Sequence, residues 1–374
     1  MKKKVEGRSA KVLIAPLDWG LGHATRSIPI IRHLIKTGRK VIIAADGRPR
    51  KLLEAEFPDL QIVRLPGYDI KYPNGGSMAS AMALQLPKII QGIWREYRWL
   101  QAWAEAEHPS LIISDNRFGL FHAKIPSVYI THQLNIQTPE RIAFLQPLLY
   151  RLHQFVIEKF TECWIPDYET LPGLAGKLSH SANLPVNARY IGPLSRFERS
   201  ISKPHQINLY DENIDLLVIL SGPEPQRSIF EEMIVAQLPK TSLHALVAEG
   251  RSEEDSDEWI TDRVRVVSRL TSQDLRNAIA RSAVILARPG YSTLMDMALI
   301  GKPVIFVPTP GQTEQEYLAS LASQGWGCVV MQQKEFNLSE AWHEIQKVGH
   351  FNPPAYQPAS FIPLLERLLN PASQ

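Results

Sequence analysis

The chain of 374 residues is longer than one ordinary domain, and its 44% hydrophobic and 21% charged residues suit a globular protein with two cores. No segment approaches the roughly 18 uninterrupted apolar residues of a membrane-spanning helix, and no dense Lys/Arg stripe with interleaved aromatic residues indicates a nucleic-acid partner. Residues 1–193 hold 25 Lys and Arg against 16 Asp and Glu, whereas residues 194–374 hold 16 against 22, so the net charge of +3 combines +9 and −6. An anionic partner of the basic half and an uneven solvated surface explain this asymmetry equally well.

The chain opens with a lysine-rich stretch, which we interpret as a basic tail before the first strand. A signal peptide is not expected, because the apolar run that follows is short and ends at Asp18. The two cysteines, Cys163 and Cys328, form no closely spaced pair and imply neither a disulfide framework nor a metal site. We therefore expect a reducing, cytoplasmic location.

Short apolar runs alternate with helix-length amphipathic segments, which is typical of parallel α/β units. Strands are predicted at residues 12–16, 40–45, 61–65, 111–114, 128–131, 163–166 and 189–191, and again at 215–220, 243–248, 264–267, 283–287, 303–307 and 327–330. The fold class is therefore α/β, with two Rossmann-like domains at residues 1–193 and 194–374 joined by a linker at 192–195. Within the tail of residues 351–374, an apolar helix at 361–369 is expected to pack back across the domains.

A loop with two glycines follows the first predicted strand. Gly20 and Gly22 allow backbone N–H groups to approach a ligand at the N-terminus of the next helix. A dinucleotide site is the competing interpretation, because Asp46 ends the second strand where a ribose-binding acid would lie. Thr25, however, stands at the third glycine position of that fingerprint, and the bulky His23 occupies the turn. NAD is therefore disfavoured, and no cofactor is expected.

A helix rich in aromatic residues is predicted at residues 84–104. Four aromatic side chains between Trp94 and Trp103 accompany Arg95 and Arg98, which is a composition that suits a face in contact with lipid. Core packing explains such a stripe more often. Peripheral membrane contact through the basic half therefore stays an open alternative.

His23 is also a candidate general base, because the pKa of imidazole lies near neutrality. Asp115 ends the fourth predicted strand. Since the ends of parallel strands converge on one crevice, we expect Asp115 to orient His23. In the alternative interpretation, His23 only hydrogen-bonds the turn and Asp115 caps a helix.

Polar residues after two later strands mark further positions of a cleft. His132 and Gln133 follow the fifth strand, where their polar groups suit a hydroxyl-rich ligand. Ser221 and Gly222 follow the first strand of the second half, and Arg227 nearby is suited to pairing with a diphosphate. Loop capping and an ordinary proline-containing turn explain the same residues.

The most sharply defined block runs from residue 287 to residue 316. Gly290 and Ser292 are expected to open a helix whose free N–H groups hold phosphate without a metal. Asp296 lies one turn further on, where its carboxylate would accept hydrogen bonds from ribose hydroxyls. A second helix is expected to begin at a capping box of Thr313 and Glu316 and to display Gln315 beside a bound sugar.

An acidic run at residues 252–258 contains the sequence Asp255-Ser256-Asp257. Such an Asp-x-Asp segment binds a divalent ion in some sugar transferases. Here the surrounding acidic residues favour a solvated loop, so no metal site is predicted.

Together these motifs resemble the glycosyltransferases of the two-domain B-type fold (GT-B), closest to the family 28 group. That group includes the bacterial enzyme that adds N-acetylglucosamine to the lipid-linked peptidoglycan precursor. The resemblance covers most of the chain and is strongest at residues 20–26, 290–296 and 311–317. Residues 132–135 are similar to the family's His-Glu-Gln-Asn segment, but Gln133 stands in place of the acid. Asp296 stands where the family more usually has Glu, and the loop at 221–227 lacks the family's glycine pair.

The resemblance implies two parallel sheets that face each other across a cleft, and the catalytic residues that we predict are His23 and, supporting it, Asp115. The donor-binding residues that the motifs and the resemblance together predict are Ser221, Gly222, Arg227, Arg288, Gly290, Ser292, Thr293, Asp296, Gln312 and Gln315. The acceptor-binding residues that it implies are Gly20, Gly22, Arg26, His132 and Gln133.

The implied activity is transfer of a sugar from a UDP-sugar to a glycan or lipid-linked acceptor, inverting and metal-independent, in cell-envelope synthesis at the inner face of the membrane. The Gly-x-Gly-His-x-x-Arg segment is also similar to nucleotide-sugar hydrolases, in which water replaces the acceptor. A catalytically silent sugar-nucleotide-binding protein is a third interpretation. The long N-terminal half favours transfer, because it offers room for an acceptor site.

Overall fold

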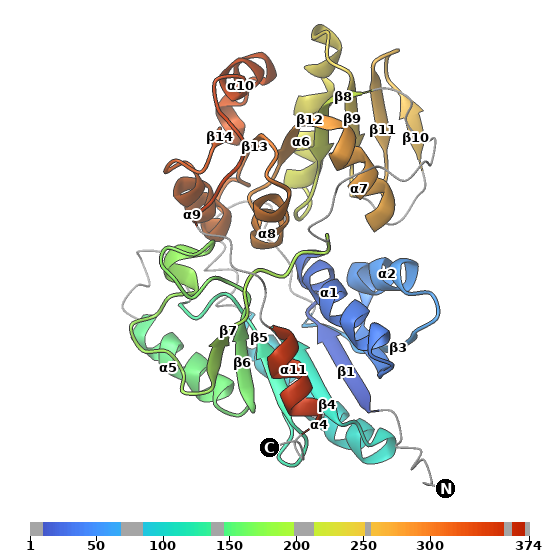
Figure 1. Ribbon diagram of the computed structural model, residues 1–374, viewed down its shortest axis with the longest axis vertical. Coiled ribbons are helices and arrows are strands. Elements are labelled where there is room, and N and C mark those ends of the chain that lie inside the picture. Colours follow the sequence, from blue (N-terminus) through green and yellow to red (C-terminus); the bar gives the residue numbers. More distant parts are fainter. Residues whose placement is uncertain are drawn as a thin grey trace, which may run out of the picture.

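The computed structural model describes residues 10–68, 85–135, 146–197, 213–250, 256–354 and 361–370. The chain forms two α/β domains, one above the other in Figure 1, each built on a sheet with helices on both faces. This confirms the predicted fold class. The basic tail of residues 1–9 and Asp255 of the acidic run lie outside the described residues.

The N-terminal sheet has the strand order β3-β2-β1-β4-β5-β6-β7, with every neighbouring pair parallel. Its strands are β1 (Lys11–Pro16), β2 (Lys40–Ala45), β3 (Gln61–Arg64), β4 (Leu111–Asp115), β5 (Ser127–Ile130), β6 (Glu162–Ile165) and β7 (Ala188–Tyr190). In the central strands nearly every residue is buried, on both faces, which explains why these strands are continuous apolar runs in the sequence.

The C-terminal sheet has the strand order β10-β11-β9-β8-β12-β13-β14. Its strands are β8 (Ile214–Ile219), β9 (Ala245–Ala248), β10 (Asp257–Trp259), β11 (Val264–Val267), β12 (Ser282–Ala287), β13 (Val304–Phe306) and β14 (Cys328–Val330). All pairs are parallel except β10 with β11. Every predicted strand is present, with ends that differ by at most two residues. The edge strand β10 was not predicted, because its three residues are exposed and mostly polar.

Each sheet has a point where the strand order reverses, and these two points position the site. In the first sheet β1 lies between β2 and β4, and in the second β8 lies between β9 and β12. The carboxyl ends of the central pairs are level, with Pro16 opposite Asp115 and Ile219 opposite Ala287. Ligands of open α/β sheets bind in the crevice at such points.

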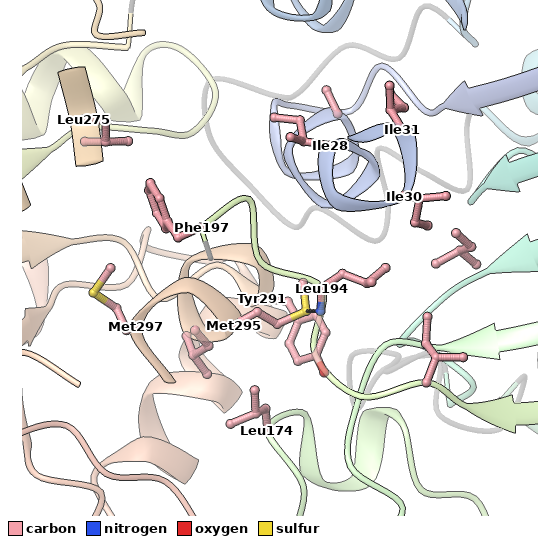
Figure 2. Packing of buried hydrophobic residues seen from close by; sticks show 14 of the residues in the cluster. Ile28, Ile30, Ile31, Leu174, Leu194, Phe197, Leu275, Tyr291, Met295 and Met297 are labelled. Atoms are coloured by element: carbon pink, nitrogen blue, oxygen red, sulfur yellow. Dashed lines mark hydrogen bonds between the residues drawn. The ribbon is translucent and has the colours of Figure 1, made fainter. Parts of the chain in front are cut away.

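The helices are α1 (Gly22–Lys36), α2 (Gly47–Glu56), α4 (Leu86–Glu107), α5 (Gln146–Ile157), α6 (Gln226–Val235), α7 (Ser272–Arg281), α8 (Tyr291–Ile300), α9 (Thr313–Ala322), α10 (Leu338–Ile345) and α11 (Phe361–Leu369). One buried apolar cluster runs through both domains. Figure 2 shows it at the linker, where Leu194 and Met295 meet beside Tyr291. The backbone N–H of Leu194 lies 3.2 Å from the Met295 Sδ. The two domains therefore share a continuous core at the linker.

The last helix packs on the first domain, as the sequence predicted. Figure 1 shows α11, in red, lying over the N-terminal sheet. Its apolar face buries Phe361, Leu365 and Leu369, at the four-residue spacing of one helical face. On its polar face, Glu366 lies 3.2 Å from Arg39, which follows α1.

A buried ion pair fastens α4 beside the carboxyl end of β4. Glu96, in the middle of α4, accepts a hydrogen bond from Arg117 at 2.7 Å and another from the Tyr68 hydroxyl at 2.7 Å. Arg117 also donates to the backbone oxygen of Pro16 at 3.0 Å. The rest of α4 therefore has a defined orientation, in which Trp94 and Ile90 point away from the core and stay exposed.

Candidate active site

The glycine loop brings the N-terminus of α1 against the N-terminus of α8. Gly20 adopts a left-handed conformation (φ +83°), which glycine favours, and α1 begins two residues later. A Cβ atom on Gly22 would lie only 2.8 Å from the Ser292 Oγ of α8. Because both helices direct free N–H groups and the positive ends of their dipoles toward this place, it favours an anion.

His23 and Asp115 meet at this point. His23 Nδ1 lies 2.8 Å from Asp115 Oδ1. Asp115 is completely buried at the end of β4, whereas the His23 side chain keeps some exposure to the cleft. The structure therefore brings together the two residues for which the sequence predicted a joint catalytic role, by the convergence of strand ends on which that prediction rested.

Arg26 supplies the charge that the buried Asp115 needs. Its Nε donates to Asp115 Oδ2 at 2.6 Å, and its Nη2 bonds to the other carboxylate oxygen. Burial alone would raise the pKa of Asp115, but Arg26 and His23 outweigh this and lower it, so the carboxylate stays ionised. The pKa of His23 is lowered, chiefly by burial and further by Arg26, against the opposing effect of Asp115. The imidazole is thus held neutral beside a carboxylate.

His132 and Gln133 reach across to the C-terminal domain. His132 Nε2 lies 2.9 Å from Glu314 Oε1, and Gln133 Nε2 donates to Glu314 Oε2 at 2.6 Å. The His132 ring stacks on Tyr291 with centroids 4.0 Å apart, and its Nδ1 lies 3.1 Å from Arg26 Nη1. These two predicted acceptor residues therefore connect the two domains.

The loops after β8, β12 and β13 face one another in the C-terminal domain. Gly222 follows β8 in a conformation that favours glycine (φ +111°), and its Cβ position would lie 3.8 Å from Thr309 Oγ1. Gly290 caps the N-terminus of α8, with Thr293 in the first turn. Within the described parts of the chain, the buried Thr309 Oγ1 and Gln312 Oε1 have no hydrogen-bond partner. Buried polar atoms are normally paired, so these two are candidates for ligand contact.

Three predicted donor residues have protein partners. Arg227 is buried and bonds Glu224 and Glu231, each at 2.6 Å. Arg288 donates to the backbone oxygens of Val307 and Pro308, at 3.0 and 3.1 Å, and so supports the loop after β13. Gln315 is buried and accepts the Thr309 N–H at 2.8 Å. Their roles toward a donor stay predictions.

Asp296 contacts the linker. Its carboxylate accepts the Ser195 hydroxyl at 2.6 Å and Arg196 Nε at 3.1 Å. Burial raises the pKa of Asp296. The predicted ribose contact therefore requires the linker side chains to release this carboxylate, or to share it.

Two buried polar atoms lie just before the glycine loop. Asp18 Oδ1 and Trp19 Nε1 are without a partner in the portion of the chain that is described. Trp19 packs edge-on against Tyr68 at 6.0 Å, and Asp18 lies against Gly67, where any Cβ would overlap its carboxyl group. Burial raises the pKa of Asp18. Both residues directly precede the glycine loop, but no functional role was predicted for either.

The predicted capping box at the start of α9 is wrong. Gln312 occupies the N-cap and makes no side-chain capping bond, and the helix begins at Thr313. Glu316 instead accepts the backbone N–H of Gly311 at 2.8 Å, two residues before Thr313, whose N–H a capping box would pair with it. Glu314, which the capping interpretation passed over, makes the contacts across the cleft.

The acidic run holds an edge strand in its described part. Asp257 lies on β10 and accepts Arg265 Nε at 2.7 Å. Over the residues that the structure describes, no group of three His, Cys, Asp or Glu side chains is placed to hold a metal ion. No described helix is long and apolar enough to cross a membrane.

The sequence is similar to that of known sugar transferases. Residues 231–360 match the model of the glycosyltransferase family 28 C-terminal domain. The chain is 24% identical over 345 residues to an uncharacterized glycosyltransferase of Methanosarcina acetivorans, covering 85% of this chain and 84% of the relative. It is 26% identical over 331 residues to the UDP-N-acetylglucosamine--N-acetylmuramyl-(pentapeptide) pyrophosphoryl-undecaprenol N-acetylglucosamine transferase of Methylobacterium sp. (strain 4-46), covering 84% and 81%.

Among solved structures, Arabidopsis thaliana UGT89C1 complexed with UDP-L-rhamnose has a similar fold. The TM-score is 0.59, with 12% sequence identity, and the match covers 97% of this chain and 99% of that one. At this level of identity the likeness shows a common fold alone.

Proposed function

We propose that this chain, which is a glycosyltransferase with the GT-B fold and a family 28 C-terminal domain, transfers a sugar from a UDP-sugar to an acceptor hydroxyl with inversion. The observation that carries the proposal is the 2.8 Å contact of His23 with Asp115, at the place where the N-termini of α1 and α8 face each other. A base and an anion site at one point are what displacement of a diphosphate by a hydroxyl requires.

His23 acts as the general base in this proposal. The ionised Asp115 can only accept a hydrogen bond, so His23 carries its proton on Nδ1, although Arg26 Nη2 also lies 2.9 Å from that atom. The Nε2 atom is then free to accept a proton. As the acceptor oxygen forms its bond to the anomeric carbon, the bond from that carbon to the diphosphate oxygen breaks. The hydroxyl proton passes to His23 Nε2, and UDP leaves. Attack from the face opposite the leaving group inverts the anomeric configuration.

The diphosphate is held by the free N–H groups at the starts of α1 and α8. Their dipoles stabilise the negative charge that grows on the leaving group, so the reaction proceeds without a divalent ion. Thr309 Oγ1 and Gln312 Oε1, buried and otherwise unpaired among the described residues, offer additional contacts to the donor. UDP as the nucleotide is supported by the names of the Methylobacterium relative and of the Arabidopsis structure.

The acceptor binds on the side of Asp18 and Trp19, whose polar atoms have no partner among the described residues and suit sugar hydroxyls. Helices α4 and α5 of the same domain expose apolar side chains, which are Leu86, Ile90, Trp94, Tyr97, Leu148, Leu152 and Phe155. Arg98 lies over the Trp94 ring at 4.8 Å and Lys159 over the Phe155 ring at 4.3 Å. Cationic and aromatic groups together suit the surface of an anionic membrane, so we place the enzyme at the inner face of the membrane, on a lipid-linked envelope acceptor.

The proposal is tested first by thermal unfolding with UDP, other nucleoside diphosphates and NAD. A ligand at 100 times its Kd adds about 2.7 kcal/mol, which is readily measured. We expect UDP to stabilise the protein, and UDP-sugars then to be consumed only when an acceptor is present. Sugar release without an acceptor would instead identify a hydrolase. Stabilisation by NAD alone would overturn the proposal.

A further inference from the structure

We propose that Glu314 is a positioning residue that makes the catalytic base dependent on closure of the two domains. The proposal rests on the function proposed above and adds to it a coupling between donor binding and His23. Glu314 belongs to the first turn of α9 in the C-terminal domain. Among the residues that the structure describes, its carboxylate bonds only side chains of the N-terminal domain, His132 at 2.9 Å and Gln133 at 2.6 Å.

The contact with His132 has a defined direction. Arg26 is protonated at all relevant pH values and donates from Nη1 toward His132 Nδ1, 3.1 Å away. Nδ1 is therefore the acceptor of the ring, and Nε2 carries the proton that is donated to Glu314. Burial raises the pKa of Glu314, but the hydrogen bond from His132, with the charge of Arg26 among the further causes, outweighs burial and lowers it. The carboxylate is thus an ionised acceptor that fixes both the tautomer and the rotation of His132.

From His132 a chain of contacts leads to the base. Arg26 bonds both carboxylate oxygens of Asp115, and Asp115 in turn contacts His23 at 2.8 Å. His132 is fixed on its other side by Tyr291, whose ring lies 4.0 Å away and whose hydroxyl donates to the Pro166 oxygen at 2.6 Å. Without the Glu314 carboxylate, His132 can rotate, and Arg26 then loses its contact with His132 Nδ1. Arg26 is no longer held between His132 and Asp115, and the position of Asp115 beside His23 is less well defined.

The same turn of α9 adjoins the donor loop. Gln315, next to Glu314, accepts the Thr309 N–H at 2.8 Å, and the unpaired Thr309 Oγ1 and Gln312 Oε1 lie in this loop. A donor that binds these groups fixes the position of α9 and therefore of the Glu314 carboxylate, which contacts His132. The base is therefore complete only after the donor has closed the cleft.

The chain offers a matched set of variants. Glu314→Gln keeps the shape and removes the charge. Glu316→Gln makes the same change two residues later, where the carboxylate bonds only the backbone N–H of Gly311 within the described parts of the chain. In the double variant Gln133→Glu with Glu314→Gln, the amide at position 314 can accept the His132 Nε2 proton through its oxygen and donate through its nitrogen to the carboxylate at position 133. Both contacts are then kept, with the charge on the other side of the cleft.

The experiment measures kcat and KM for both substrates, together with the radius of gyration by small-angle X-ray scattering, with and without UDP. For Glu314→Gln we expect kcat to fall about 10- to 100-fold, as misplacement of a catalytic group causes, with the KM for the donor changed much less. We also expect a larger radius of gyration. The double variant should recover most of kcat, and Glu316→Gln should match the wild type.

A Glu314→Gln protein with wild-type kcat, or a double variant no better than Glu314→Gln alone, would overturn the positioning role. An unchanged radius of gyration would overturn the link to closure. Failure of the proposed function is a separate result, since wild-type protein that turns over no UDP-sugar would refute the transferase while the scattering comparison still tests closure by Glu314.

Discussion

His23 works in surroundings that oppose its protonation. It contacts Asp115, Arg26 lies 2.9 Å from its Nδ1, and burial lowers its pKa. A neutral imidazole with one nitrogen directed at a carboxylate is ready to take a proton, whereas an exposed histidine near its ordinary pKa of about 6.5 is partly charged at neutral pH. Replacing His23 by Ala should therefore leave UDP binding unchanged and lower kcat by about 10²- to 10⁴-fold. Steady-state kinetics with a UDP titration measures both quantities, and an unchanged kcat would remove His23 from the mechanism.

The pH dependence follows from the same pKa. Protonated His23 is inactive, so kcat/KM should fall as the pH drops through the pKa of His23, which lies below the ordinary value of about 6.5. Asp115→Asn removes the charge that raises this pKa. The acid limb of the profile should then move to still lower pH, while the plateau falls because the base is weaker and no longer oriented. A limb that stays in place in the Asn variant would assign it to another group.

The joint placement of His23 and Asp115 was predictable, because each follows or ends a strand and strand ends converge. The partner of His132 was not. Glu314 faces it only because the two domains close at one particular angle, and no local pattern in either half encodes that angle. The one signal was the amide at Gln133, where the resemblance leads one to expect an acid.

Among the elements, α4 packs closely against the segment that follows β4. Gly119 lies where a Cβ would overlap the backbone oxygen of Ile93 and come within 2.7 Å of the Glu96 Cβ and 2.9 Å of the Tyr97 nitrogen. Since backbone atoms of α4 cannot step aside independently, Gly119→Ala should destabilise the protein by about 1–3 kcal/mol and lower its melting temperature. Gly349→Ala is the matched control, because nothing lies within 4 Å of its Cβ position. Equal melting temperatures for the two variants would contradict the packing argument.

The buried strands were more predictable than the starts of the helices and the exposed edge strand. Continuous apolar runs such as residues 40–45 mark buried parallel strands directly, since both faces are covered. The start of α9 was misjudged because Thr313 and Glu316 have the spacing of a capping box, yet Glu316 reaches the Gly311 nitrogen in a loop shaped by Gln315 and Thr309. That geometry depends on contacts from outside the helix, which a local spacing rule does not include.

At the scale of the whole molecule, the apolar side chains of α4 and α5 give the N-terminal domain a face that the C-terminal domain lacks among its described residues except at isolated positions. Trp94→Ser with Phe155→Ser should weaken cosedimentation with anionic lipid vesicles, because both rings and their adjacent cations suit such a surface. Trp259→Ser is the control. Trp259 is 60% exposed, close to the 57% of Trp94, and also has an arginine over its ring, but it lies on β10. An equal loss of cosedimentation in both variants would indicate nonspecific adsorption through any exposed aromatic ring rather than a binding face on α4 and α5.

The position of α11 affects how the molecule is made. Its apolar face completes the core of the first domain, although it is synthesised after the whole of the second. As the chain leaves the ribosome, an apolar surface beside α1 therefore stays exposed on the first domain while the second domain emerges and folds. During that interval the nascent chain exposes the apolar surface that α11 later covers. A chaperone that binds this surface would prevent new chains from aggregating with one another.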